Sequence, residues 1–131
     1  MYTLSAKYQD NPVVKQSFEF AVKVVEYAEI LETKRKFTIA NQLIKSGTSI
    51  GANIKEAQNA ESKADFIHKM KIALKEADET EYWLFLCESI ESYPKCSSLI
   101  EQLQPLLKML NKIIGTSKRN HADEQIRLSA N

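Results

Sequence analysis

Apolar residues recur at spacings of three and four along most of this sequence, and this periodicity constrains the fold more than any other feature. Between residues 36 and 59 the recurring positions are Ile39, Leu43, Gly47, Ile50, Ile54 and Ala57. Residues spaced in this way lie on one face of an α-helix. Only three glycines and three prolines occur among the 131 residues, so few positions can end a helix. The pattern therefore predicts an all-α fold of long helices.

We expect four helices, over residues 12–32, 36–59, 63–91 and 95–115. Asn11 followed by Pro12 is typical of a helix start. Ser62 with Asp65 resembles a capping box, although Glu or Gln is the usual partner. Helices of this length joined by short turns favour an antiparallel up-down-up-down four-helix bundle. The alternative is a pair of helical hairpins that completes its core only in an oligomer.

Two residues of the last helix predict where it starts or kinks and where it ends. Pro105 predicts a kink or a late helix start, because proline removes one backbone hydrogen bond. Gly115 predicts the end of the helix, since glycine is common just beyond a helix C-terminus. Residues 116–131 show no periodic apolar face and are expected to form a mobile tail beyond a bundle of residues 1–115.

The first helix has more apolar surface than one bundle core uses. Two stripes run along it: Val13, Phe20, Val24, Tyr27 and Leu31, and then Val14, Phe18, Ala21, Val25 and Ala28. The second stripe is either a wide core face or a contact between subunits. In the third helix the core stripe is Phe66, Met70, Ala73, Ala77, Leu84 and Cys87. Glu81 interrupts that stripe.

A run of small residues, 46–52, lies inside the second expected helix and includes Gly47 and Gly51. Each glycine costs about 1 kcal/mol of helix propensity relative to alanine. Close approach of a neighbouring backbone usually offsets such a cost, so we expect close helix packing at both glycines. The pair is no phosphate loop, because it follows no strand and lacks the Gly-Lys-Ser/Thr ending.

No set of residues in this sequence meets the requirements of a catalytic or metal site. His68 has no carboxylate or cysteine three or four residues further on, and His121 is the only other histidine. Cys87 and Cys96 form no CxxC pair and have no evident base, so we expect reduced thiols. The carboxylates of Glu76, Asp78, Glu79 and Glu81 lack the Glu-x-x-His pattern of bundle di-metal sites. We therefore predict no enzyme activity, no cofactor and no small-molecule substrate.

Charge is unevenly distributed although the formal net charge is only +1. Residues 33–71 hold eight Lys or Arg and three acids, whereas residues 72–101 hold two Lys and seven acids. Such a dipolar chain could bind a polyanion or pair opposite faces between subunits. The candidate nucleic-acid-binding residues are Lys34, Arg35, Lys36, Lys45 and Lys55. With no secretory signal and no apolar run near the ~20 residues of a membrane span, a cytoplasmic protein is expected.

Residues 46–57 and 63–84 carry a family resemblance. Their segments SIGANIKEA and KIALKEADETEYWL are fairly specific together and weak apart. The chain resembles, over residues 12–115, the bacterial four-helix bundle proteins encoded in intervening sequences of 23S ribosomal RNA genes. Where many members read Ala-Glu-Gly after the Asn-Ile pair, this chain has Lys55, Glu56 and Ala57.

The resemblance implies a left-handed four-helix bundle. The accessory proteins of diversity-generating retroelements share this fold, and similarity to them implies a homopentamer that binds RNA or DNA through a basic surface. The expected function is thus that of a non-enzymatic, oligomeric helical-bundle protein with a nucleic-acid partner. The alternative is a protein–protein adaptor whose charge asymmetry serves assembly alone.

Overall fold

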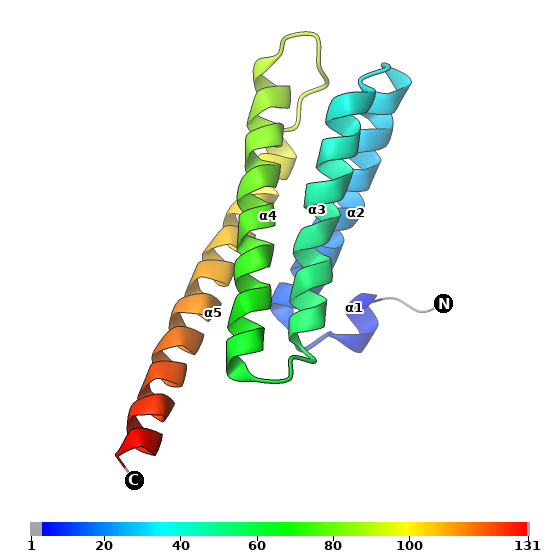
Figure 1. The fold of residues 1–131 in the computed structure, drawn as a ribbon. Coiled ribbons are helices and arrows are strands. Elements are labelled where there is room, and N and C mark those ends of the chain that lie inside the picture. The colour runs from blue at the N-terminus through cyan, green and yellow to red at the C-terminus, as the bar shows by residue number, and fades with distance from the viewer. Residues whose placement is uncertain (1–3, 131) are drawn as a thin grey trace.

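The computed structural model describes residues 4–130, which are all-α and contain no strand. A short helix precedes four long ones: α1 (Leu4–Lys7), α2 (Pro12–Thr33), α3 (Phe37–Ala57), α4 (Lys63–Ser89) and α5 (Ser97–Ser129). The α2–α3 turn and the α4–α5 loop lie at one end of the molecule, and the α3–α4 turn lies at the other (Figure 1). The all-α fold with four long helices is the predicted one, whereas α1 was not predicted.

The starts of α2 and α4 follow from the residues at their N-termini. The Asn11 side chain accepts a hydrogen bond from the Val14 amide, and Pro12 occupies the first helical position. Asn11 also donates to the Gln58 side chain at 3.0 Å, which ties the start of α2 to the end of α3. Ser62 accepts from the Asp65 amide at 3.0 Å and caps α4 as predicted. The sequence signals therefore located both starts correctly.

The core is formed by one apolar stripe from each long helix. In α2 the whole first stripe is buried, whereas Phe18, Ala21 and Val25 of the second stripe are only partly buried. In α4 the side chain of Thr80 faces the core, and the interrupting Glu81 instead accepts a hydrogen bond from Gln104 of α5 at 2.9 Å. The largest fully buried apolar side chains are Leu31, Leu43, Ile50, Ile54, Met70, Leu84, Leu103, Leu106, Leu110, Val14 and Val24.

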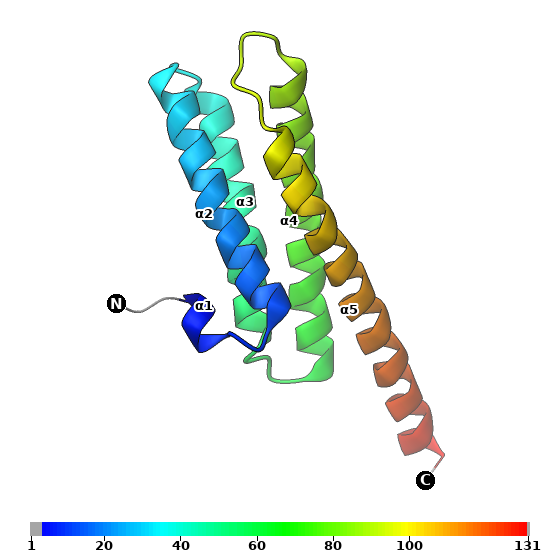
Figure 2. The same cartoon turned by 180° about the vertical axis from the view of Figure 1, so that it is seen from behind.

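The predictions for the end of the last helix were wrong. α5 begins at Ser97, two turns before Pro105, and it continues through Pro105 and past Gly115 to Ser129. Gly115 has no positive φ, so its backbone does not adopt the left-handed conformation that ends helices. The expected tail is thus helical over 116–129 and projects beyond the bundle (Figures 1 and 2), while residue 131 lies outside the described range. None of the helices between residues 4 and 130 is both long and apolar enough to cross a membrane.

Candidate nucleic-acid interface

The predicted basic cluster of residues 34–36 forms the turn between α2 and α3, and its backbone is firmly held. The Lys36 amide donates to the Leu31 carbonyl and the Arg35 amide to the Glu32 carbonyl, both at 2.9 Å. This pair of bonds is a Schellman motif, in which the residue after the cap is normally glycine. Arg35 occupies that position with φ of 62°, a conformation that disfavours residues with a Cβ.

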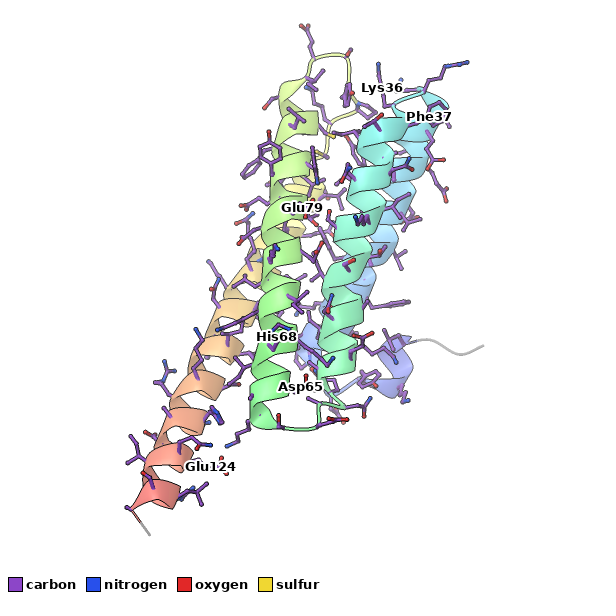
Figure 3. All side chains as sticks on the ribbon, viewed as in Figure 1. Lys36, Phe37, Asp65, His68, Glu79 and Glu124 are labelled. Atoms are coloured by element: carbon purple, nitrogen blue, oxygen red, sulfur yellow. The ribbon has the colours of Figure 1, made fainter. Side chains whose placement is uncertain are left out.

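The three side chains of this turn have different surroundings. Lys34 and Arg35 are exposed and belong to none of the ion pairs found within residues 4–130. Lys36 is partly buried, and its Nζ lies 5.2 Å from the centre of the Tyr93 ring. This cation–π contact joins the turn to the α4–α5 loop, which lies beside it in Figure 3. The role of Tyr93 was not predicted, because no local sequence pattern pairs a loop tyrosine with a distant lysine.

An exposed aromatic ring accompanies the basic turn. Phe37 follows directly as the first residue of α3, is 51% exposed and lies at the same end of the bundle (Figure 3). A large apolar side chain next to free cations offers a surface on which a nucleic-acid base can stack. Two exposed cations, Lys34 and Arg35, and one exposed ring, Phe37, therefore lie within four consecutive residues.

The other two candidate lysines lie away from this turn. Lys45 and Lys55 are exposed on α3. At a rise of ~1.5 Å per residue they lie about 14 Å and 28 Å along the helix from Lys36. Lys55 is thus at the opposite end of the bundle, and the five predicted residues do not form a single site.

The small-residue run lies where α2 and α3 approach each other. A Cβ added to Gly47 would lie 2.7 Å from Val24 Cγ1, and one added to Gly51 would lie 3.3 Å from Ser17 Oγ. The Ser17 backbone is 3.4 Å from that second position. On its other side α3 is joined to α4 by a buried hydrogen bond of 2.9 Å from Thr80 to Ser46. Short side chains therefore allow both neighbours to pack closely against α3.

An apolar groove of about 500 Å³ runs along the outside of the α2–α3 pair and extends to α1. It is lined by Leu4, Phe18, Ala21, Val22, Val25, Glu26, Thr48, Gly51, Ala52 and Lys55. Three of these residues belong to the second apolar stripe predicted in α2, and Val22 between them is 43% exposed. The contribution of Leu4 was not predicted from the sequence, since α1 itself was not predicted. Part of the second stripe thus forms an outward-facing apolar surface.

The two cysteines lie inside the bundle near the Tyr27 side chain. Burial raises the pKa of the Cys96 thiol to about 12 and also raises the pKa of Cys87. The Cys96 thiol lies 3.2 Å from the Leu84 carbonyl, and the Tyr27 hydroxyl donates to the Pro94 carbonyl. Both thiols are free and remain protonated at neutral pH, so they are poor nucleophiles.

The acidic cluster and the histidines do not converge on a centre. Glu81 faces α5, whereas Glu79 and His68 are exposed on α4 (Figure 3). Over residues 4–130 the structure contains no group of three His, Cys, Asp or Glu side chains arranged to hold a metal ion.

The fold and these surfaces define a helical-bundle protein with a basic turn at one end and an apolar groove along one side. The family described as 23S rRNA-intervening sequence protein matches residues 9–112, so the chain belongs to this family. A crystal structure from Bacteroides thetaiotaomicron VPI-5482, of a protein with unknown function from the S23 ribosomal protein family, is 46% identical to it. The match covers 78% of this chain and 97% of that chain, with a TM-score of 0.74. Among curated proteins none matches the chain.

Proposed function

We propose that this protein is a non-enzymatic, cytoplasmic accessory protein that assembles into a homo-oligomer and binds RNA or DNA through the basic turn of residues 34–36. In this proposal each subunit is an antiparallel, left-handed bundle and the oligomer is a pentamer. The observation that carries the proposal is Arg35, a long cationic side chain held in a conformation that glycine would adopt more readily. Backbone strain of this kind is concentrated at functional sites.

Assembly is supported by the apolar groove beside α2 and α3. Contiguous exposed apolar surface on a protein usually marks a site of interaction. The groove is lined by Gly51, which also lies at the close α2–α3 contact. A second copy that covers Val22 and Val25 would remove this surface from water, and burial of apolar area would drive the association.

Nucleic-acid binding is supported by the chemistry of the turn. Lys34 and Arg35 are exposed and free of carboxylate partners within the described residues, and Phe37 lies beside them. Two or three cations give a weak site in one subunit. A cyclic oligomer repeats that site around a ring, and several weak contacts to one strand add up to useful affinity. Binding should then be independent of sequence and dependent on assembly.

The assembly half of the proposal is tested by placing a charge in the groove. Val22→Glu should dissociate the oligomer into folded monomers, because an unpaired carboxylate would be buried at the contact. Ile30→Glu is the matched control, since Ile30 lies on the same helix, is 47% exposed and does not line the groove. Sedimentation velocity measures the size of each species. A monomeric wild type at micromolar concentration, or an unchanged oligomer in Val22→Glu, would contradict the proposal.

The binding half is tested by removing the charge of the turn. Replacing Lys34, Arg35 and Lys36 by Glu should abolish RNA and DNA binding while helicity and oligomer size stay the same. Lys36 also contacts Tyr93, so the double variant Lys34→Gln/Arg35→Gln serves as a milder version that leaves this contact in place. Lys23→Gln, at an exposed position of α2 away from the turn, is the control for loss of charge. Undiminished binding by the triple variant would show that the turn is not the site.

The alternative function is that of a protein–protein adaptor without a nucleic-acid partner. The small net charge of +1 favours it, because dedicated nucleic-acid binders are usually more basic. In this case the basic and acidic stretches would pair between subunits. The adaptor interpretation replaces the proposed function if the wild type binds neither RNA nor DNA at low salt.

A further inference from the structure

Phe37 is an aromatic residue whose ring has no partner on the surface of the bundle. It is the first residue of α3, it lies outside the core cluster, and it does not line the apolar groove. Within residues 4–130 it takes part in no ring–ring or cation–π contact, and the neighbouring Lys36 ammonium lies over the ring of Tyr93 instead. The exposed half of the Phe37 ring is therefore free to contact a ligand.

Two further aromatic side chains are exposed, but the sequence around them is acidic. Tyr82 and Phe85 both lie on α4. Residues 78–81, which contain three carboxylates, directly precede them and disfavour a phosphate group at that surface. Phe37 instead directly follows the basic turn of residues 34–36. Of these three exposed rings, only Phe37 thus adjoins a run of cations.

The backbone of the turn holds the cations and the ring at a short separation. The amides of Arg35 and Lys36 are both hydrogen-bonded to carbonyls of the last turn of α2, and Phe37 begins a regular helix. Lys34 and Phe37 are three residues apart, so their Cα atoms are separated by at most ~11 Å. Binding needs to order only the side chains on this fixed backbone, which lowers its entropic cost.

We infer that this site takes an unpaired nucleic-acid strand, in which one base stacks on the Phe37 ring while Lys34 and Arg35 contact adjacent phosphates. The inference rests on the proposed function and names the form of nucleic acid that binds there. Aromatic side chains stack on bases that are splayed out of a strand, whereas bases within a duplex are covered by their neighbours. Cations alone favour a duplex, because it carries the denser row of phosphates. The ring therefore gives the preference for an unpaired strand.

The test compares the affinity of the intact protein for three RNA probes of equal length at one salt concentration. The probes are an unpaired strand without self-complementary segments, the corresponding duplex, and a strand whose residues are abasic. The wild type should bind the unpaired strand most tightly. Phe37→Ala should lower that affinity at least about fivefold, the smaller limit for the loss of one stacked base. Its affinities for the duplex and for the abasic strand should stay the same, since both contact only the cations.

Phe85→Ala is the matched control. Phe85 is 47% exposed against 51% for Phe37, and it lies in the acidic segment. Its replacement should change the affinity for none of the three probes. Sedimentation velocity should give the same oligomer size for the wild type and both variants.

The outcomes separate this inference from the proposed function. If the wild type binds RNA but prefers the duplex, or if Phe37→Ala binds the unpaired strand as tightly as the wild type, the inference is wrong while the proposed function stands. An equal loss of affinity for all three probes, or a smaller oligomer in Phe37→Ala, would assign the ring to folding or assembly and would also overturn the inference. A wild type that binds none of the probes at low salt would contradict both.

Discussion

The contact between α2 and α3 differs in chemistry from the contact between α4 and α5. α3 approaches α2 through Gly47 and Gly51, and an apolar groove continues the same face outward. α5 is joined to α4 through a leucine-rich core and through side-chain links at its edge, such as Lys63–Glu124. Both helix pairs, α2–α3 and α4–α5, bury apolar side chains in the core. The difference is that apolar surface continues outward from the α2–α3 pair, and the proposed contact between subunits rests on that surface.

Overfilling the α2–α3 contact should have the largest effect on stability. Gly47→Leu should destabilise the protein by about 3 kcal/mol, because its Cβ alone would overlap Val24 and the packed core must shift. Gly51→Leu should cost about 1 kcal/mol, because its Cβ is less crowded and the adjoining groove can accept the side chain. Chemical denaturation measures both values. Equal stability of Gly47→Leu and the wild type would show that the two helices do not depend on close approach.

Substitution of Gly115, which lies in α5, should change the stability of the protein in the opposite direction. Gly115→Ala should stabilise the protein by about 1 kcal/mol, the difference in helix propensity. The new Cβ would meet only Arg119 Nη1 at 3.5 Å, which is an ordinary contact. Thermal unfolding of Gly115→Ala and Gly47→Ala under the same conditions should give shifts of opposite sign. A loss of stability in Gly115→Ala would mean that α5 is not a regular helix at that point.

A substitution in the basic turn should change the stability of the protein and its RNA binding in opposite directions. Arg35→Gly should raise the unfolding free energy by about 0.5–1 kcal/mol, because glycine adopts the positive φ without steric cost but loses more chain entropy on folding. The same variant should weaken RNA binding, because it removes an exposed cation. Equilibrium denaturation and a binding titration on one preparation give both numbers. Unchanged RNA affinity in a more stable variant would indicate that Arg35 has no binding role.

Removal of the α5 extension should have the smallest effect. Most side chains of residues 116–129 are exposed, and the extension contributes to the described ion pairs only through Glu124 with Lys63. An exposed pair of this kind stabilises a protein by roughly 0–1 kcal/mol. Truncation after Gly115 should therefore shift the unfolding midpoint only slightly. A large loss of stability would show that the extension is part of the core.

Local signals explain which parts of the fold could be predicted from the sequence. Asn11 with Pro12 and Ser62 with Asp65 located two helix starts, because capping depends on residues that are neighbours in the chain. The end of α5 was missed because a glycine ends a helix only when its backbone adopts the left-handed conformation. Gly115 does not adopt it, and no neighbouring residue reveals that choice.

The candidate sites could be predicted less well than the helix starts, because local signals describe only part of them. The second apolar stripe of α2 indicated an outward surface, since it depends on spacing within one helix. The contact of Lys36 with Tyr93 joins residues far apart in the sequence and leaves no pattern along the chain.

We propose that assembly creates the nucleic-acid-binding surface, and a comparison of RNA affinity in the wild type and in Val22→Glu across a series of salt concentrations tests this proposal. We predict that the wild type binds RNA at low salt, that its log affinity falls linearly with log salt concentration, and that the dissociated variant binds far more weakly. Equal affinity of the oligomer and the monomeric variant would contradict the claim, as would a wild type that binds no RNA at low salt.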